Sequence, residues 1–195
     1  MSGAPILFLA LELPHEARQR LTPPLGRLAA LDPGVRPARA DGLHLTLRFL
    51  GRVEPEAEPS LRIAAERVAR RTTEFLVELG GLGVFPNLAQ PRVVWVGVRA
   101  GVAELDRLAG ALGAELVRAG WSPERRPFRA HCTLARVAQP LGQRPGLLLA
   151  ELIDQLRQES SIGFRAQRLA LLESVAVDGG PNRYPCPASW PFQAG

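Results

Sequence analysis

The sequence contains no lysine, because all 24 of its lysine-plus-arginine residues are arginine. A Walker-type phosphate loop requires a lysine at the β- and γ-phosphates, so that class of ATPase or GTPase is excluded. Enzymes that form a lysyl-nucleotide intermediate or a Schiff base use lysine as the nucleophile, and they are excluded as well. The missing lysine therefore removes ATP-dependent ligation through lysine and several kinds of covalent catalysis.

Cysteines and long hydrophobic runs are also scarce. The two cysteines, Cys132 and Cys186, form neither a zinc-binding pattern nor a disulfide framework. The longest apolar run, residues 6–11, is too short to span a membrane, and no basic segment typical of a signal peptide precedes it. We therefore expect a cytoplasmic protein that has no contact with the membrane.

The charge balance of the chain has two explanations. The formal net charge is +5 for 195 residues, a length that fits one domain or two small lobes sharing an interface. The arginine bias can reflect genome composition, or it can reflect affinity for phosphate or RNA, to which arginine makes planar bidentate contacts. Composition alone leaves both explanations open.

Hydrophobic periodicity predicts alternating strands and helices along the whole chain. Strands are expected at residues 6–13, 43–50, 75–84, 92–99, 128–137 and 164–177, with a short last strand near Tyr184. Helices are expected at residues 16–31, 55–71, 102–119 and 147–159. The order strand, helix, strand, helix, strand occurs twice, which predicts two similar halves related by a pseudo-two-fold axis.

Two of the three histidines begin the same four-residue motif, His-x-Thr-Leu. On a strand, residues two apart share a face, so each motif presents an imidazole and a hydroxyl on one side and packs with the other. If the two strands meet, one cleft receives two imidazoles and two hydroxyls. The motifs are His44-Leu45-Thr46-Leu47 and His131-Cys132-Thr133-Leu134.

Two histidines without a third ligand suit general acid–base catalysis, in which one imidazole accepts a proton and the other donates one. A phosphodiester fits the remaining groups, since threonine hydroxyls and arginine can hold its oxygens. His15, at an expected helix start, is given a structural role. A nucleophilic Cys132 and a metal site are the competing interpretations; strand alternation buries Cys132, and the motif strands bring no carboxylate ligand.

The arginines that complete the site are harder to choose. Arg48 lies four residues after His44, and Arg129 lies two residues before His131. Regular alternation places each arginine on the same face as its histidine, so both are candidates to face the cleft. Arg136 and Phe49 stand five residues after the two histidines, where strict alternation turns them away. They reach the cleft only if a β-bulge or a strand end redirects them.

These motifs resemble the signature of the two-histidine phosphoesterase superfamily. Further segments are similar, in order, to bacterial RNA 2′,3′-cyclic phosphodiesterases, long called 2′-5′ RNA ligases. One departure from that family is Ala130 and Cys132 around the second histidine, where members often have proline and an aliphatic residue. The similar segments are residues 8–14, 43–51, 80–86, 92–98, 124–137, 173–174 and 180–184.

The resemblance implies an α+β, bilobal fold in a single catalytic domain, 1–195, with two antiparallel sheets lining a central cleft and helices outside. It implies hydrolysis of an RNA 2′,3′-cyclic phosphate to a 2′-phosphate without metal or cofactor, with weak 2′-5′ ligation in reverse. It makes His44 the proton donor and His131 the proton acceptor. The phosphate-binding residues it implies are Thr46, Thr133 and Arg136, and Phe49 is the base-stacking residue.

Two other functions remain open at this point. The same catalytic residues could act on small cyclic phosphates, such as a cyclic nucleotide or ADP-ribose cyclic phosphate, or the fold could bind RNA without catalysis. The expected partner is RNA with a 2′,3′-cyclic end or a 2′-5′ linkage, including tRNA-derived RNA, and the expected state is a monomer.

Overall fold

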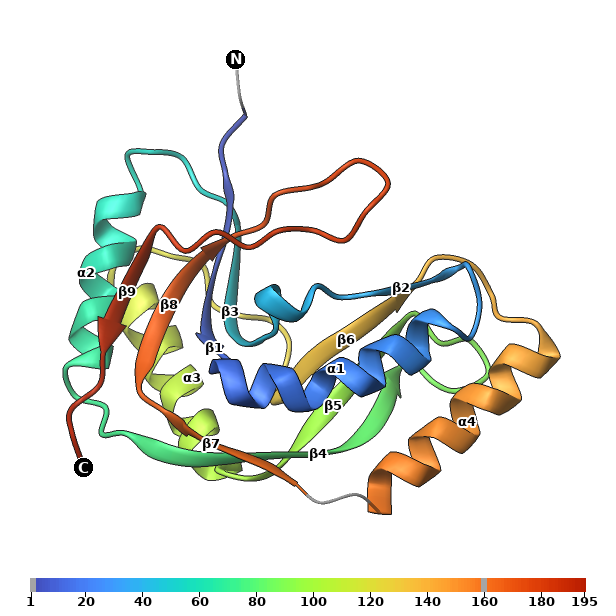
Figure 1. Ribbon diagram of the computed structural model, residues 1–195. Helices are drawn as coiled ribbons and strands as arrows, with labels where there is room; N and C mark the ends of the chain where they lie inside the picture. The colour runs from blue at the N-terminus through green and yellow to red at the C-terminus, as the bar shows by residue number, and fades with distance from the viewer. Residues whose placement is uncertain (1–2, 159–160) are drawn as a thin grey trace.

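Alternating apolar residues place the strands of the protein in one curled antiparallel sheet (Figure 1). The computed structural model describes residues 3–158 and 161–195. Along the sheet the strand order is β7-β4-β5-β6-β3-β1-β8-β9, and β2 pairs separately with β6. The strands are β1 Ile6–Glu12, β2 Val35–Pro37, β3 His44–Arg52, β4 Phe75–Phe85, β5 Val93–Ala100, β6 His131–Val137, β7 Ile162–Ala166, β8 Arg168–Glu173 and β9 Ala188–Pro191.

The helices cover the outer face of the sheet with their apolar sides. In α3 the leucines at helical spacing, such as Leu105 and Leu112, are fully buried. Helices α2 and α3 pack beside β3, β8 and β9, whereas α1 and α4 pack beside β4, β6 and β7 (Figure 1). The helices are α1 His15–Ala29, α2 Glu58–Ala69, α3 Val102–Arg118 and α4 Gln143–Gln158, with a short 3-10 helix, η1 Ala40–Gly42.

The sheet consists of two halves that meet at its centre. One half runs β7-β4-β5-β6 and the other β3-β1-β8-β9, so the two motif strands, β3 and β6, are neighbours. The register between them gives a single pair, Leu45 opposite Cys132. The predicted α+β class with antiparallel strands is confirmed, and the two expected sheets are halves of one sheet that this pair joins.

Several predicted boundaries are wrong. The strand expected at 128–137 begins only at His131, and the long strand expected at 164–177 is two strands, β7 and β8, that separate at Gln167. Near Tyr184 the chain forms only an isolated bridge between Val175 and Arg183, and the last strand is β9. Strand β2 was not predicted, because it has three residues and ends in proline.

Helix α4 begins at Gln143, four residues before the predicted start, and residue 159 of that prediction lies outside the described residues. No helix among the described residues has the length and apolar character needed to cross a membrane.

Buried leucines fill a continuous core between the sheet and the helices. Leu45 and Cys132, the pair that joins the two halves, are both fully buried in that core. A second, small cluster lies on the other face of β1 and β8, and consists of Phe8, Ala10, Ala170 and Leu172 with Tyr184 packed against it. The central strand β1 is therefore covered on both faces.

We predict that Leu45→Ala lowers the free energy of unfolding by about 2–5 kcal/mol, because it opens a cavity where the two halves join. The matched control is Leu76→Ala, since Leu76 is 63% exposed on β4 and its truncation should change stability by less than about 0.5 kcal/mol. Urea unfolding followed by circular dichroism measures both. Equal losses in the two variants would contradict a central role for this pair.

Candidate active site

Each motif histidine is the first residue of one of the two central strands of the sheet. His44 is the first residue of β3, and His131 is the first residue of β6. The following residues, Leu45 and Cys132, are directly opposite each other and point into the core. Because side chains alternate along a strand, both histidines and both motif threonines lie on the other face of the sheet.

The antiparallel register then sets which side chains are neighbours on that face. With Leu45 opposite Cys132, His44 stands beside Thr133, and Thr46 stands beside His131. Directly opposite residues have Cβ atoms about 5 Å apart, and diagonal ones roughly 7–8 Å. In this register the two imidazoles stand at diagonal positions on the same face of the sheet.

Each imidazole is held by the same hydrogen bond. Nδ1 of His44 lies 2.7 Å from the carbonyl oxygen of Gly42, and Nδ1 of His131 lies 2.7 Å from that of Arg129. A carbonyl can only accept a hydrogen bond, so Nδ1 is the donor in both rings. In the neutral tautomer Nε2 therefore carries the free lone pair, and both rings can exchange a proton only through Nε2.

Aromatic rings pack against both histidines. The ring centroids of Phe8 and Tyr184 each lie 4.8 Å from that of His44. The ring centroids of Phe85 and Trp95 lie 5.2 and 6.2 Å from that of His131. The aromatic neighbours restrict the orientation of each imidazole and exclude water from one side of it.

Burial lowers the pKa of His44 below its usual range, because it removes water from the charged form. The hydrogen bond to the Gly42 carbonyl opposes this shift, and the positive charges of His131 and Arg136 add to it. These charge effects also place His131 and Arg136 within electrostatic range of His44. At neutral pH, His44 of the free protein is therefore the neutral imidazole.

A β-bulge interrupts the first motif strand just after its threonine. Ala10 of β1 is opposite Thr46, and the preceding residue Leu9 is opposite Arg48, so Leu47 has no partner of its own. An extra residue of this kind reverses the alternation of the side chains that follow it. Leu47 and Arg48 are accordingly both buried.

The second motif strand has a bulge at the equivalent position. Trp95 of β5 is opposite Thr133, and Val94 is opposite Ala135, so Leu134 is the additional residue. Leu134 and Ala135 are both fully buried. The two strands thus share the motif and also the β-bulge that follows it.

The bulges return Arg136 and Phe49 to the face of the histidines. Arg136 lines a pocket of about 160 Å³ together with His44 and Thr133. Phe49 is opposite Phe8, which contacts His44, and its side chain is 56% exposed. The structure therefore provides the redirection that alternation alone did not predict for either residue.

The same bulge moves Arg48 out of the predicted site. Arg48 is only 8% exposed on the opposite face of β3, where it donates a hydrogen bond to the Ser122 carbonyl. Its Nη1 lies 3.3 Å from a carboxylate oxygen of Glu124. The expectation that Arg48 faces the cleft is wrong, because the residue after a bulge changes face; Arg48 instead ties β3 to the segment that leads into β6.

Arg129 lies before the first residue of β6, so strand alternation does not determine its direction. Its side chain is exposed and is not part of the pocket beside His44. Its carbonyl oxygen, however, holds Nδ1 of His131. Arg129 therefore contributes through its main chain.

Sequence reasoning missed several residues near the histidines. Trp95 is half-buried and faces His131. Tyr184 and Arg36 line the pocket beside His44. The sequence places Trp95 in a strand, but the face to which Trp95 points depends on the pairing of β5 with β6. No sequence signal marked the other two residues, because Tyr184 is in a loop and Arg36 is in the short strand β2.

Cys132 is fully buried, and burial raises the pKa of its thiol to about 12. A thiol with such a pKa is not a nucleophile at neutral pH, in agreement with the prediction from strand alternation. Over residues 3–158 and 161–195, no group of three or more His, Cys, Asp or Glu side chains is arranged to hold a metal ion.

The lowered pKa of His44 predicts a pH dependence of stability. Between pH 7 and 5 the unfolded chain takes up a proton at this histidine near its ordinary pKa of about 6.5, before the folded protein does. The free energy of unfolding should therefore fall as the pH drops through this range, and His44→Gln should remove this part of the fall. Urea unfolding at several pH values measures it, and parallel curves for the two proteins would refute the shift.

Comparison with known proteins agrees with this geometry. A family model described as the 2′-5′ RNA ligase superfamily matches residues 13–178. An Aeropyrum pernix protein named RNA 2′,3′-cyclic phosphodiesterase is 34% identical over 165 residues, covering 80% of this chain and 90% of that protein. An Escherichia coli protein of the same name is 38% identical over 139 residues, covering 71% of this chain and 75% of that protein.

Solved structures share the fold over almost the whole chain. The crystal structure of TT0787 of Thermus thermophilus has a TM-score of 0.77 at 26% identity, covering 97% of this chain and 98% of that one. Escherichia coli LigT in apo form has a TM-score of 0.72 at 30% identity, covering 98% of this chain and 99% of that one. Since the family model spans most of the sequence and both motifs lie within it, the chain belongs to the 2′-5′ RNA ligase superfamily.

Proposed function

We propose that the protein hydrolyses the 2′,3′-cyclic phosphate at the end of an RNA and leaves a 2′-phosphate. The observation that carries this proposal is the diagonal pair of imidazoles, each with Nδ1 bound to a carbonyl and Nε2 available for proton transfer. The relatives named RNA 2′,3′-cyclic phosphodiesterase support the choice of substrate.

The reaction needs one proton acceptor and one proton donor on opposite sides of the phosphorus atom. Nε2 of His131 accepts a proton from water as its oxygen forms a bond to phosphorus. Nε2–H of His44 donates a proton to O3′ as the bond between phosphorus and O3′ breaks. The product is the 2′-phosphomonoester, with the proton of His44 transferred to the ribose and that of water to His131.

Thr46, Thr133 and Arg136 bind the two non-bridging oxygens of the phosphate. Each threonine stands beside the histidine of the other motif, so its hydroxyl can donate to the group between the imidazoles. The Arg136 guanidinium adds a positive charge where negative charge develops in the transition state. Phe49, exposed at the corresponding position of the other strand, provides a surface on which a base stacks.

The reverse reaction joins a 2′,3′-cyclic end to a 5′-hydroxyl and gives a 2′-5′ linkage without ATP. Water at about 55 M competes with a dilute RNA end for the same phosphate, and the same acid and base serve both directions. Ligation is therefore a weak side activity of the hydrolase.

The proposal extends to the protein as a whole. One bilobal catalytic domain, 1–195, suffices as a monomer, because each half of the sheet supplies one motif strand. Its partners are RNA ends, tRNA-derived ends included, and its place of action is the cytoplasm.

The direct test uses a short RNA that ends in a 2′,3′-cyclic phosphate. We expect phosphorus NMR to show a 2′-phosphate, and we expect EDTA to leave the rate unchanged. His44→Gln and His131→Gln should each lower kcat by about 10²–10⁴-fold, since each removes a proton-transfer group. Binding of the 2′-phosphate product should change far less.

Cyclic AMP and ADP-ribose cyclic phosphate serve as comparison substrates in that assay. Turnover of these compounds with none of the RNA end would identify a phosphodiesterase of small cyclic phosphates. RNA binding without turnover in the wild-type protein would identify a binding protein of the same fold. Wild-type rates in both histidine variants would make the assigned site wrong.

The pKa of His44 predicts how the rate depends on pH. As proton donor, His44 must be protonated, yet burial lowers its pKa in the free enzyme. The value of kcat/KM should therefore fall as the pH rises through this lowered pKa. The profile of kcat should extend to higher pH, because the anionic substrate stabilises the imidazolium. If kcat/KM instead rises with pH in this range and His44→Gln removes the rise, His44 is the base and the two roles are exchanged.

A further inference from the structure

The pocket beside His44 continues past the reacting groups to a second arginine. Arg36 and Arg136 both line it, and no carboxylate does. Its opposite wall is the end of the long loop between β8 and β9, which reaches over the side of the molecule where β2 lies (Figure 1). In that wall, Asn182 donates a hydrogen bond of 2.9 Å to the Ser174 hydroxyl, which fixes the wall before any ligand binds.

The two arginines are direct cross-strand neighbours. Arg36 of β2 is opposite Arg136 of β6. Like charges at directly opposite positions destabilise a sheet. Some arginines elsewhere on this protein lie beside carboxylates, as in the pairs Arg62–Glu58 and Arg70–Glu66. Among residues 3–158 and 161–195, no carboxylate pairs with Arg36 or Arg136.

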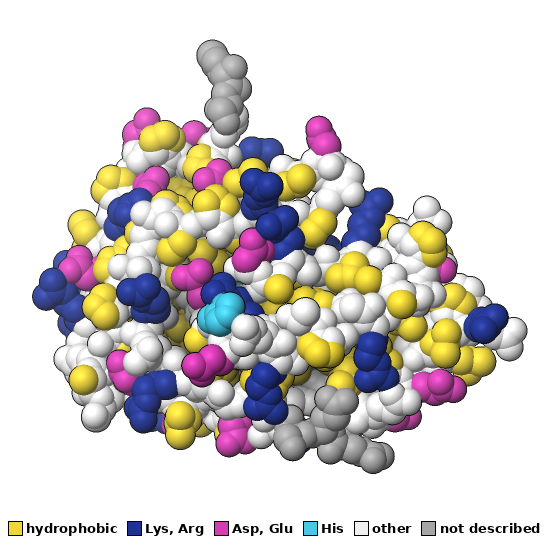
Figure 2. Space-filling view, viewed as in Figure 1, with side chains coloured by type: hydrophobic (Ala, Val, Ile, Leu, Met, Phe, Trp, Pro, Cys, Tyr) yellow, Lys and Arg dark blue, Asp and Glu magenta, His cyan; other side chains and the backbone are white. Residues whose placement is uncertain are grey.

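This pairing differs from the general distribution of charge. On the face shown in Figure 2, arginines and acidic side chains are interspersed and form no continuous basic patch. The arginine pair at the pocket is thus a local excess of positive charge. Such an excess, left without counter-charge in a pocket, is the usual arrangement for binding an anion.

One reacting phosphate does not account for both arginines. A cyclic phosphodiester carries a single negative charge, and Arg136 together with protonated His44 already faces it with two positive charges. Arg136 is the nearer arginine, because its charge is felt by His44. Arg36 is therefore available for another anion, and the next anion in an RNA end is the phosphate on O5′ of the terminal nucleotide.

We propose that Arg36 binds the 5′-phosphate of the terminal nucleotide, so that the enzyme selects cyclic ends that continue into RNA over a lone nucleoside 2′,3′-cyclic phosphate. Arg136 and Arg36 then contact successive phosphates of one strand. This inference rests on the proposed function, since it defines the neighbouring phosphate relative to the reacting one.

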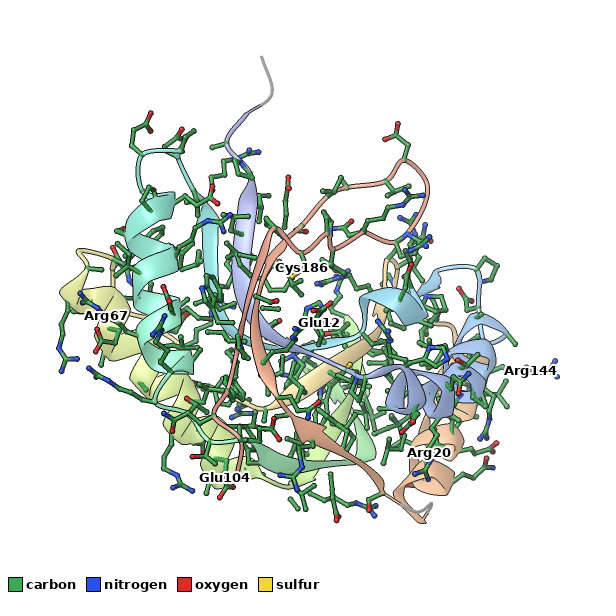
Figure 3. All side chains as sticks on the ribbon, turned by 60° about the vertical axis from the view of Figure 1, so that its left-hand side comes forward. Glu12, Arg20, Arg67, Glu104, Arg144 and Cys186 are labelled. Atoms are coloured by element: carbon green, nitrogen blue, oxygen red, sulfur yellow. The ribbon has the colours of Figure 1, made fainter. Side chains whose placement is uncertain are left out.

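A matched pair of substrates tests the proposal: adenosine 2′,3′-cyclic phosphate with a 5′-hydroxyl, and the same compound with a 5′-phosphate. Wild-type kcat/KM should be roughly tenfold to hundredfold higher for the 5′-phosphorylated compound, as expected for charge-assisted hydrogen bonds to one phosphate. Arg36→Gln should lose this preference. The control Arg67→Gln, on the outer helical side of the molecule (Figure 3), should keep it.

Binding gives a readout that does not need turnover. Calorimetry should show that adenosine 2′,5′-bisphosphate binds the wild-type protein more tightly than adenosine 2′-phosphate, and that Arg36→Gln binds the two alike. The proposal is overturned if the wild-type protein does not distinguish the compounds, or if Arg36→Gln weakens both equally, which would place Arg36 at the reacting phosphate. A bisphosphate preference in a protein that hydrolyses neither cyclic compound, nor a short RNA with a 2′,3′-cyclic end, would support the arginine site and refute the proposed reaction.

Discussion

A single extra residue in each central strand determines what the cleft contains. Without the bulges at Leu47 and Leu134, strict alternation would bury Arg136 and Phe49 and would turn Arg48 toward the histidines. Because both bulges follow the motif threonine directly, the imidazole and hydroxyl remain in regular strand geometry while the next side chain toward the cleft is redirected. Because both halves have the same β-bulge, their backbones remain similar. The side chains that the bulges redirect toward the cleft are nevertheless different in the two halves.

That difference gives the cleft two unlike ends. Arg136 and Phe49 occupy equivalent positions in the two halves, but one is a cation and the other an exposed aromatic ring. The strands and the paired His-x-Thr motifs are nearly symmetric, whereas an RNA end is not. In the proposed complex, the orientation of the RNA in the cleft therefore comes from residues beyond the motifs, which are Phe49 on one side and Arg136 with its neighbour Arg36 on the other.

Sequence alone was sufficient for the parts of the site that depend on short-range alternation. His44, Thr46, His131 and Thr133 could be placed on one face because each pair lies within three residues of regular strand. Arg48 could not, because a bulge has no reliable signature in one strand and is defined by pairing with its neighbour. Strand β2, which contains Arg36, could not be predicted for a related reason. Its three residues are too few to show the alternation of apolar and polar side chains that marks a strand.

The hydrogen bonds that fix Nδ1 of both imidazoles also constrain how the enzyme begins its next cycle. In the proposed reaction His44 is neutral in the free protein but protonated in the substrate complex, where His131 is neutral, and each turnover leaves His44 neutral and His131 protonated. Since Nδ1 is bonded to a carbonyl in both rings, neither proton can pass through the protein behind the site. Before the next turnover His131 must lose a proton and His44 must gain one, and both exchanges take place at Nε2. Restoring these protonation states is thus a separate kinetic step, and buffer acids and bases small enough to enter the cleft can catalyse it.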